Sequence, residues 1–265
     1  MSDEVKVLEA EQKEKELSPA ESATIEEMAK AGILYGRKKS KTHPRMKSMI
    51  YATRSGMEVL DLAKTLACLI KAGEFLKEVA KKGGGILVIG TMPASQVVVE
   101  EFAKKNGLLF VIKRWLGGTL TNFKTINQRI QYYINLKTDK AAGKLEKYTK
   151  KEQSDFDKEI ARLSGFFSGL ESMSVLPQAM VIIDTVEHEI ALREAQRLNI
   201  PVVGIINTDS NPEEIAYPIP ANSNAKTSVS WLLNQLGVKI EEGAKERIVA
   251  LAQVVVATTS KPATK

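Results

Sequence analysis

Short, continuous apolar runs alternate with helical patterns along most of this sequence, and that alternation limits the possible folds more than any other feature. The runs are aliphatic and β-branched without polar alternation, which is typical of strands buried on both faces of a parallel sheet. We expect such strands at residues 86–89, 108–112, 179–183, 202–206 and 216–219. Helices are expected beside them, at residues 63–81, 93–105, 187–198 and 222–236. Because crossovers between parallel strands are right-handed, this order predicts a three-layer α/β/α sandwich.

One long segment interrupts the alternation. Residues 113–178 separate two of the expected strands, which is far more chain than a crossover needs. Apolar residues recur there in two heptad-like series on either side of a polar stretch at residues 137–151. The series are Phe123, Ile126, Ile130 and Tyr133, then Phe156, Ile160, Leu163, Phe167 and Leu170. We predict an inserted antiparallel coiled-coil hairpin whose arms reach roughly 22–30 Å from the core.

The predicted domain organisation combines these patterns with the composition of the N-terminal end. Residues 1–28 hold nine acidic residues against three lysines, and residues 1–21 contain no aromatic side chain, so this end is expected to be disordered. The predicted units are an acidic, disordered tail at 1–21, a parallel α/β core at 22–121 and 172–243, an inserted helical hairpin at 122–171, and a C-terminal helix with a flexible end at 244–265.

Positive charge is concentrated just after the acidic tail. The chain has a formal net charge of +6, but residues 29–54 hold eight lysines and arginines and no acidic residue. A solvated face usually mixes both signs, so this segment indicates a polyanionic partner, although a merely solvated charged loop stays open as an interpretation. Gly36 and Pro44 disfavour a regular helix, and we predict that residues 37–54 form an extended loop that follows an RNA backbone.

A second basic cluster, Lys113-Arg114-Trp115, directly follows an expected strand and precedes the first arm of the hairpin. Trp115 has two interpretations, since it can pack against the base of the hairpin or stack on an RNA base. The candidate RNA-binding residues of both clusters are Arg37, Lys38, Lys39, Lys41, His43, Arg45, Lys47, Arg54, Lys113, Arg114, Trp115, Asn122 and Lys124.

The sequence carries no recognisable catalytic motif. No Gly-x-Gly-x-x-Gly follows a strand and no P-loop motif occurs. Cys68 is the only cysteine, which excludes a disulfide or a multi-cysteine zinc site and fits a reducing cytosol. Polar residues do stand at the expected strand ends, where α/β sheets bind ligands, and they support an alternative hypothesis of a flavodoxin-like enzyme or small-ligand site. These residues are Thr91, Asp184, His188 and Asp209.

Ordinary helix-cap and turn chemistry at Asp184, Thr185 and Asn211-Pro212 is the interpretation that we favour over a ligand site. Asp184, His188 and Asp209 are the candidate metal ligands at the strand ends. No pair of these groups specifies a reaction, so we predict no metal, no cofactor and no enzymatic activity.

Residues 113–126, Lys-Arg-Trp-Leu-Gly-Gly-Thr-Leu-Thr-Asn-Phe-Lys-Thr-Ile, resemble the signature of the bacterial small-subunit ribosomal protein S2 family. Segments 32–50, 86–91, 176–188 and 199–220 agree with the family pattern in the same order. The resemblance covers most of the chain, and it implies a flavodoxin-like parallel sheet with an inserted coiled-coil hairpin.

The resemblance also implies a function. Members of the family are structural, rRNA-binding parts of the small ribosomal subunit, which contact the 16S ribosomal RNA between head and body. They lie among other small-subunit proteins and help to recruit the large RNA-binding ribosomal protein number one. We therefore expect a cytoplasmic, ribosome-associated protein with no membrane partner. The sequence begins without a secretory signal pattern and has no apolar run long enough to span a bilayer.

Four positions depart from the family pattern. Arg37 and Lys113 stand where the family commonly has histidine, which replaces a titratable ring by a permanent cation. Asn207 and Asn211 stand where aspartate is frequent, which weakens the case for an ion at the strand ends. The acidic tail is outside the usual pattern altogether.

Overall fold

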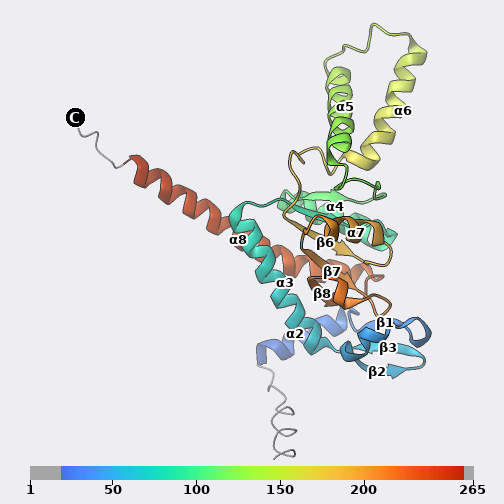
Figure 1. Cartoon of the computed structure of the whole chain (residues 1–265), viewed down its shortest axis with the longest axis vertical. Coiled ribbons are helices and arrows are strands. Elements are labelled where there is room, and N and C mark those ends of the chain that lie inside the picture. Colours follow the sequence, from blue (N-terminus) through green and yellow to red (C-terminus); the bar gives the residue numbers. More distant parts are fainter. Residues whose placement is uncertain (1–18, 260–265) are drawn as a thin grey trace, which may run out of the picture.

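The centre of the fold is a parallel sheet of five strands, in a computed structural model that describes residues 19–259 (Figure 1). The strand order is β5-β4-β6-β7-β8, and every neighbouring pair is parallel. The strands are β4 (Ile86–Ile89), β5 (Leu109–Val111), β6 (Ala179–Ile183), β7 (Val202–Ile206) and β8 (Tyr217–Pro220). All residues of β4, β6 and β7 are buried, so the predicted three-layer α/β/α fold is confirmed.

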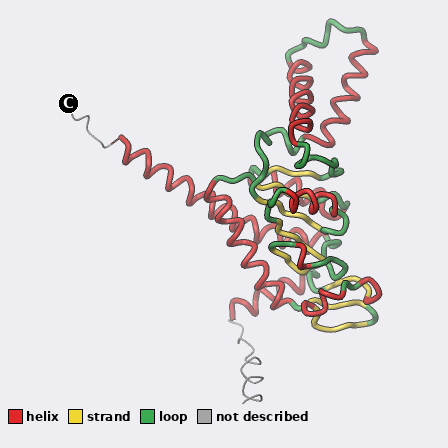
Figure 2. Tube along the Cα trace, in the orientation of Figure 1, coloured by secondary structure: helices red, strands yellow, loops and turns green. Residues whose placement is uncertain are grey.

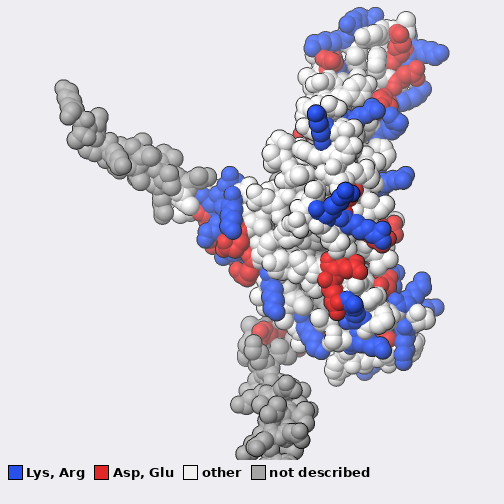
Figure 3. Space-filling model, in the orientation of Figure 1, with Lys and Arg blue, Asp and Glu red and all other residues white. Residues whose placement is uncertain are grey.

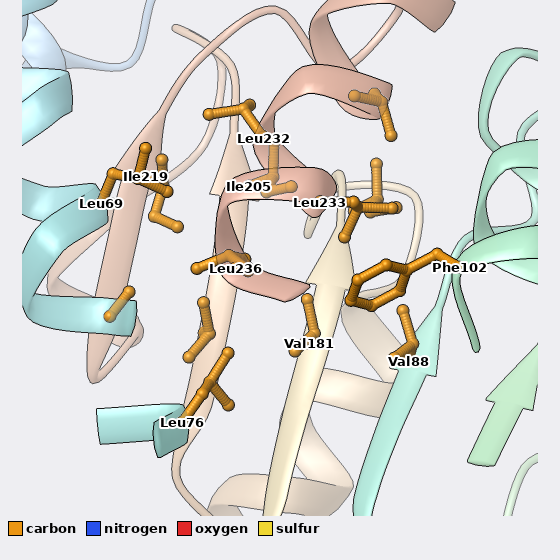
Figure 4. Close-up of a cluster of buried hydrophobic side chains, with 14 of the residues drawn as sticks. Leu69, Leu76, Val88, Phe102, Val181, Ile205, Ile219, Leu232, Leu233 and Leu236 are labelled. Carbon is orange, nitrogen blue, oxygen red and sulfur yellow. The ribbon is translucent and has the colours of Figure 1, made fainter. Parts of the chain in front are cut away.

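Three helices cover one face of this sheet, namely α3 (Leu62–Lys82), α4 (Pro93–Asn106) and α8 (Lys226–Thr259). Figure 4 shows side chains of α8, such as Leu232 and Leu236, lying against Val181 and Ile205 of the strands. Capping residues at both ends of α3 fix where the helix begins and where it stops. The Asp61 carboxylate accepts hydrogen bonds from two backbone N–H groups of the first turn, and the helix ends at a left-handed glycine, Gly83.

The opposite face packs against α7 (Glu189–Arg197), against the segment that follows β5, and against the ends of the two inserted helices that lie nearest the core. Alternate strand residues point this way, as a pleated sheet requires, so Leu87 and Ile89 join this second apolar cluster. Met46 and Leu60, from the N-terminal part of the chain, are fully or almost fully buried in the same cluster. The N-terminal basic segment is therefore anchored on the same face that supports the hairpin.

The insertion contains two helices, α5 (Phe123–Ala141) and α6 (Lys150–Phe167), which project from the core and are joined by a loop at their far end (Figures 1 and 2). Thr149 and Glu152 form a reciprocal capping box that fixes the start of α6. Of the two predicted apolar series, five members are buried and the other four, Phe156 among them, are half-buried. The buried members are Ile130, Tyr133, Leu163, Phe167 and Leu170. The coiled-coil packing of the pair stays a prediction.

The predicted extended loop at residues 37–54 was wrong. The chain there forms a second, three-stranded antiparallel sheet with order β1-β3-β2. Its strands are β1 (Tyr35–Lys38), β2 (Ile50–Arg54) and β3 (Met57–Leu60), and the 3-10 helices η1 (Lys39–Lys41) and η2 (Pro44–Met49) connect β1 to β2. A basic sequence without apolar alternation gives no sign of strands, and here pairing with β3 and docking on the core impose them.

Gly36 makes the docking of this small sheet possible. A Cβ at this position would lie 2.6 Å from Thr208 Cγ2 and 2.9 Å from the Glu58 carbonyl oxygen. Those distances are too short for any side chain, so only glycine lets β1 pass between the central strand β3 and the end of the parallel sheet.

The two ends of the chain differ from the expected boundaries. The helix α2 (Pro19–Lys30) includes residues 19–21 of the predicted disordered tail, while residues 1–18 lie outside the described part. The helix α8 continues well past the predicted end at residue 236 and runs without a break through residue 243 (Figure 1). Residues 260–265 lie outside the described part. Within residues 19–259 no helix combines the length and apolar character that crossing a membrane requires.

Candidate nucleic-acid interface

Arg37 is held at the carboxyl ends of the parallel strands. Its Nη2 lies 3.0 Å from Asp184 Oδ2, and its Nε lies 3.1 Å from Asp209 Oδ2. Its backbone N–H donates to Thr208 Oγ1 at 2.9 Å, so both backbone and side chain of Arg37 attach β1 to the segments after β6 and β7. Asp184 is fully buried and also accepts a hydrogen bond from Ser223 Oγ at 2.9 Å. A cation predicted to bind RNA is thus paired with two carboxylates of its own chain.

The pKa of Asp209 shows which unfavourable effects the pairing with Arg37 offsets. Burial raises the pKa of Asp209 above its ordinary value; the Arg37 charge lowers it and the neighbouring Asp184 raises it further. The balance indicates two carboxylates crowded into a poorly solvated site, with one guanidinium between them. The Arg37 guanidinium is therefore already occupied by carboxylates of its own chain.

His188 uses both ring nitrogens inside the protein. Nδ1 lies 2.8 Å from the Asp184 carbonyl oxygen, which can only accept, so Nδ1 carries the proton. Nε2 is then the acceptor for the backbone N–H of Thr91 at 3.2 Å and for the Thr91 hydroxyl at 3.0 Å. The imidazole is therefore a neutral structural bridge between two strand ends.

The capping interpretation is confirmed for Asp184 and Asn211. Asp184 Oδ1 accepts from the backbone N–H groups of Val186 and Glu187 at 3.2 Å and 3.4 Å, ahead of α7. Asn211 caps η3 (Pro212–Glu214) in the same way. Among residues 19–259 no group of three or more histidine, cysteine, aspartate or glutamate side chains is arranged to hold a metal ion, so Asp184, His188 and Asp209 find no support as ligands.

The remaining candidates of the N-terminal segment divide into paired and unpaired cations. Arg45 forms an ion pair with Glu213, and His43 is half-buried and accepts from the Arg45 backbone N–H at the start of η2. The other candidates are exposed and form no ion pair with any described residue. They are Lys38, Lys39, Lys41, Lys47 and Arg54. In Figure 3, Lys and Arg atoms gather at this end of the molecule and again along the hairpin.

The second basic cluster lies on a loop that a buried carboxylate holds in place. Glu194 of α7 is 7% exposed, and its two oxygens accept from the backbone N–H groups of Gly118, Leu120 and Thr121 at 2.8–3.1 Å. The Thr121 hydroxyl adds a bond at 3.2 Å. Gly118 has a φ of 87°, a conformation that the turn needs in order to direct its N–H toward the carboxylate.

Trp115 belongs to the same arrangement. Its ring is buried, 8% exposed, and its Nε1–H donates to Glu194 Oε1 at 3.0 Å. The base-stacking interpretation of Trp115 was wrong, because the ring packs in the core and offers no open face. The hydrogen bonds also set the charge of Glu194. Burial alone would raise the pKa of Glu194, but bonds from the Trp115 indole and from the loop N–H groups outweigh burial and hold that pKa below its ordinary value.

The cations of the loop that Glu194 holds are exposed to solvent. Lys113, Arg114, Asn122 and Lys124 are exposed, and the three cations make no ion pair with a described residue. The Lys113 side chain crosses the base of α6, where a Cβ on Gly165 would lie 2.8 Å from Lys113 Nζ. The structure therefore presents these residues together near the base of the hairpin, as the sequence predicted.

Sequence reasoning missed Glu194 and the two arginines beside it. Arg193 and Arg197, both exposed, border a shallow pocket of about 250 Å³ that Thr121 and Ile190 also line. Arg193 pairs with Glu189, whereas Arg197 has no ion pair within the described residues. A signal for Glu194 was present, because it lies three residues after Ala191 and four before Leu198, on the apolar face of the helix.

Residues 28–243 match the family model for ribosomal protein S2. The chain belongs to the ribosomal protein S2 family. It is 40% identical over 223 residues to the small ribosomal subunit protein uS2 of Bdellovibrio bacteriovorus, an alignment that covers 84% of this chain and 71% of the relative. The uS2 proteins of Dictyoglomus thermophilum and Dehalococcoides mccartyi are 39% and 35% identical, over 83% of this chain and 89% and 90% of their own lengths.

The S2 family match includes both basic clusters, the strand ends and the inserted helices, because all of them lie within residues 28–243. It does not include the last part of α8 or the acidic residues 1–27. Nothing in the S2 match supports the alternative hypothesis of a flavodoxin-like enzyme.

Proposed function

We propose that this S2 family member is a structural component of the small ribosomal subunit, and that it binds ribosomal RNA through two basic surfaces. The family match over residues 28–243 supports the ribosomal role, and it is the observation on which the proposal mainly rests. The first surface is the N-terminal basic surface, made of Lys38, Lys39, Lys41, Lys47 and Arg54. The second is the hairpin-base surface, made of Lys113, Arg114, Asn122 and Lys124.

The unpaired cations support this choice of surfaces. Phosphate binding needs lysine and arginine side chains that are accessible and not already neutralised, because binding energy comes largely from releasing counterions. Both surfaces meet that condition, whereas Arg37 and Trp115 are engaged inside the protein and Arg45 already pairs with Glu213 at the surface. The proposal therefore assigns to these three a supporting role, in place of direct phosphate contact.

We extend the proposal to partners and location. The S2 resemblance supports contact with the 16S ribosomal RNA, with neighbouring small-subunit proteins and with the large RNA-binding ribosomal protein number one, in the cytoplasm. It also supports a role without enzymatic activity. The strand ends, where an enzyme of this fold would bind a ligand, hold the Arg37 ion pairs and a histidine whose two nitrogens are occupied.

The test uses the full chain with Lys39, Lys41 and Lys47 changed to Gln. Binding to 16S ribosomal RNA should weaken at least tenfold, and the slope of log K against log salt should fall by roughly two to three, about one for each lost phosphate contact. The matched control changes Lys81, Lys104 and Lys105 to Gln, which removes the same charge from cations that pair with Glu246, Glu100 and Glu241. Equal weakening in both variants would mean that only net charge matters, and no weakening in the first would reject the proposed surface.

A further inference from the structure

The outer face of the antiparallel sheet has a defined composition, because strand pairing sets which side chains share it. Tyr35 and Ala52 are both paired with Val59 of the central strand, so these three form one row across the sheet. Lys38 and Arg54 are both paired with Met57, which forms the next row. Paired residues of antiparallel strands point to the same side, and two residues along a strand return to that side. One face therefore presents an apolar row beside a row with a cation at each end.

This face is open to solvent. Tyr35 is 54% exposed and Met57 is 39% exposed. The intervening residue of the central strand, Glu58, points the other way, is 4% exposed and accepts a hydrogen bond from Thr53 Oγ1 at 2.7 Å. The one carboxylate of these three strands is thus removed from the outer face, and no acidic residue occurs at positions 29–54.

The Tyr35 ring is partly supported from behind. A Cβ at Gly32 would lie 3.7 Å from Tyr35 Cδ2, so the edge of the ring rests beside the turn that follows α2. An aromatic ring positioned in this way, on a β-sheet, can accept a stacked planar group at little further cost in side-chain entropy.

We infer that this outer face binds an unpaired segment of RNA, with a base stacked on Tyr35 and the flanking phosphates near Lys38 and Arg54. The inference rests on the proposed function and names the kind of RNA that one of its surfaces takes. A double helix buries its base faces and presents phosphate and ribose, so an exposed aromatic ring beside a row that carries two cations fits a single strand better. A stable protein partner generally needs about 20–30 residues on each side, which this small face does not provide.

The experiment compares the full chain with Tyr35→Ala and Tyr35→Phe, using a single-stranded oligoadenylate and an RNA duplex of the same length as probes. Tyr35→Ala should weaken binding of the single strand about tenfold, whereas Tyr35→Phe should keep it, because stacking needs the ring and not the hydroxyl. The salt slope should not change, since no charge is lost, and duplex binding should not change. Tyr132→Ala is the control, because Tyr132 on α5 is similarly exposed at 45%.

A second pair of variants separates stacking from charge and from folding. Lys38→Gln with Arg54→Gln should lower the salt slope for the single strand by roughly 1.4, about 0.7 for each lost phosphate contact. Tyr35→Leu, which keeps apolar area without a ring, should weaken binding as Tyr35→Ala does. Single-strand binding that survives both Tyr35→Ala and Tyr35→Leu would overturn the inference, as would a parent chain that binds only the duplex. If those results accompany weakened rRNA binding by the Lys39, Lys41 and Lys47 variant, the proposed function stands without the stacking site.

Discussion

The N-terminal basic surface and the hairpin-base surface are both attached to the parallel core by buried or half-buried carboxylates, but the two attachments differ in kind. In the first, Asp184 and Asp209 hold the Arg37 guanidinium, so the attachment uses one of the cations of the segment. In the second, Glu194 holds backbone N–H groups and the Trp115 indole, so every cation of the loop stays free.

This contrast shows two ways in which a basic protein can hold a surface rigidly, only one of which leaves all of its positive charge available. An ion pair attaches one side chain at one point, and its strength depends on the burial of both charges. A carboxylate that accepts several N–H bonds fixes the path of the backbone itself, without lowering the charge that the loop presents. We expect the loop at residues 113–122 to depend more strongly on its carboxylate than the small sheet depends on Arg37.

Glu194→Gln should produce the largest loss of stability. The amide keeps one acceptor oxygen but directs an NH₂ group at backbone N–H donors, so several buried bonds are lost or opposed. We expect a loss of about 3 kcal/mol in the free energy of unfolding, measured by urea denaturation. Glu189→Gln, one turn earlier on the exposed side of α7, is the matched control and should cost less than about 0.5 kcal/mol. Similar losses in the two variants would contradict the role of Glu194.

Arg37→Gln should have a smaller but clear effect, because it leaves Asp184 and Asp209 close together without their cation. The Arg37 side chain is 28% exposed, so water screens part of the loss, and we expect about 2 kcal/mol. Adding Asp209→Asn to Arg37→Gln should recover part of it, because one of the two crowded charges disappears. A double variant less stable than Arg37→Gln alone would show that the carboxylates do not repel each other enough to matter.

The sequence predicted the parallel core well for a physical reason. Strands such as 86–89, 179–183 and 202–206 are continuous apolar runs, and their bounds coincide with β4, β6 and β7 because nothing but burial on both faces decides them. The inserted helices were predicted from a local repeat. In each case the information lies within a few neighbouring residues.

The attachments could not be predicted in the same way, because they join residues far apart in the chain. Arg37 and Asp184 are separated by 147 positions, and Arg37 and Thr208 by 171. Arg37 therefore looked like one more phosphate contact, and Trp115 looked like a possible stacking residue until its bond to Glu194 was seen. A single sequence shows which residues carry charge, but it does not show which of those charges are paired with other groups of the folded chain.

The stability contributions of Glu194 and Asp209 should change with pH in opposite directions. The pKa of Glu194 is held below its ordinary value of 4.5, so its contribution to stability is complete above that value and is lost as pH falls through the folded pKa. The pKa of Asp209 is raised above its ordinary value of 3.8, mainly by burial, so its contribution is present at low pH and is lost as pH rises through the folded pKa.

The measurement is urea denaturation of the parent, Glu194→Gln and Asp209→Asn from about pH 3 to pH 7. The stability difference between parent and Glu194→Gln should shrink on acidification below 4.5. The difference between parent and Asp209→Asn should instead become less favourable to the parent as pH rises. Parallel curves for the two variants would mean that both carboxylates are held in the same way.

The smallest effect expected is on the salt dependence of rRNA binding, and it compares the two surfaces directly. Arg114 is exposed and unpaired within the described residues, so Arg114→Gln should lower the slope of log K against log salt by about 0.7–0.9. Arg37→Gln removes the same formal charge but should leave the slope nearly unchanged, because Arg37 is already neutralised by Asp184 and Asp209. Filter binding of the full chain to 16S ribosomal RNA at several salt concentrations measures both, with Lys105→Gln, whose partner is Glu241, as the control. A slope change for Arg37→Gln as large as that for Arg114→Gln would mean that RNA draws the guanidinium away from its carboxylates, and the attachment of the small sheet would then be part of binding.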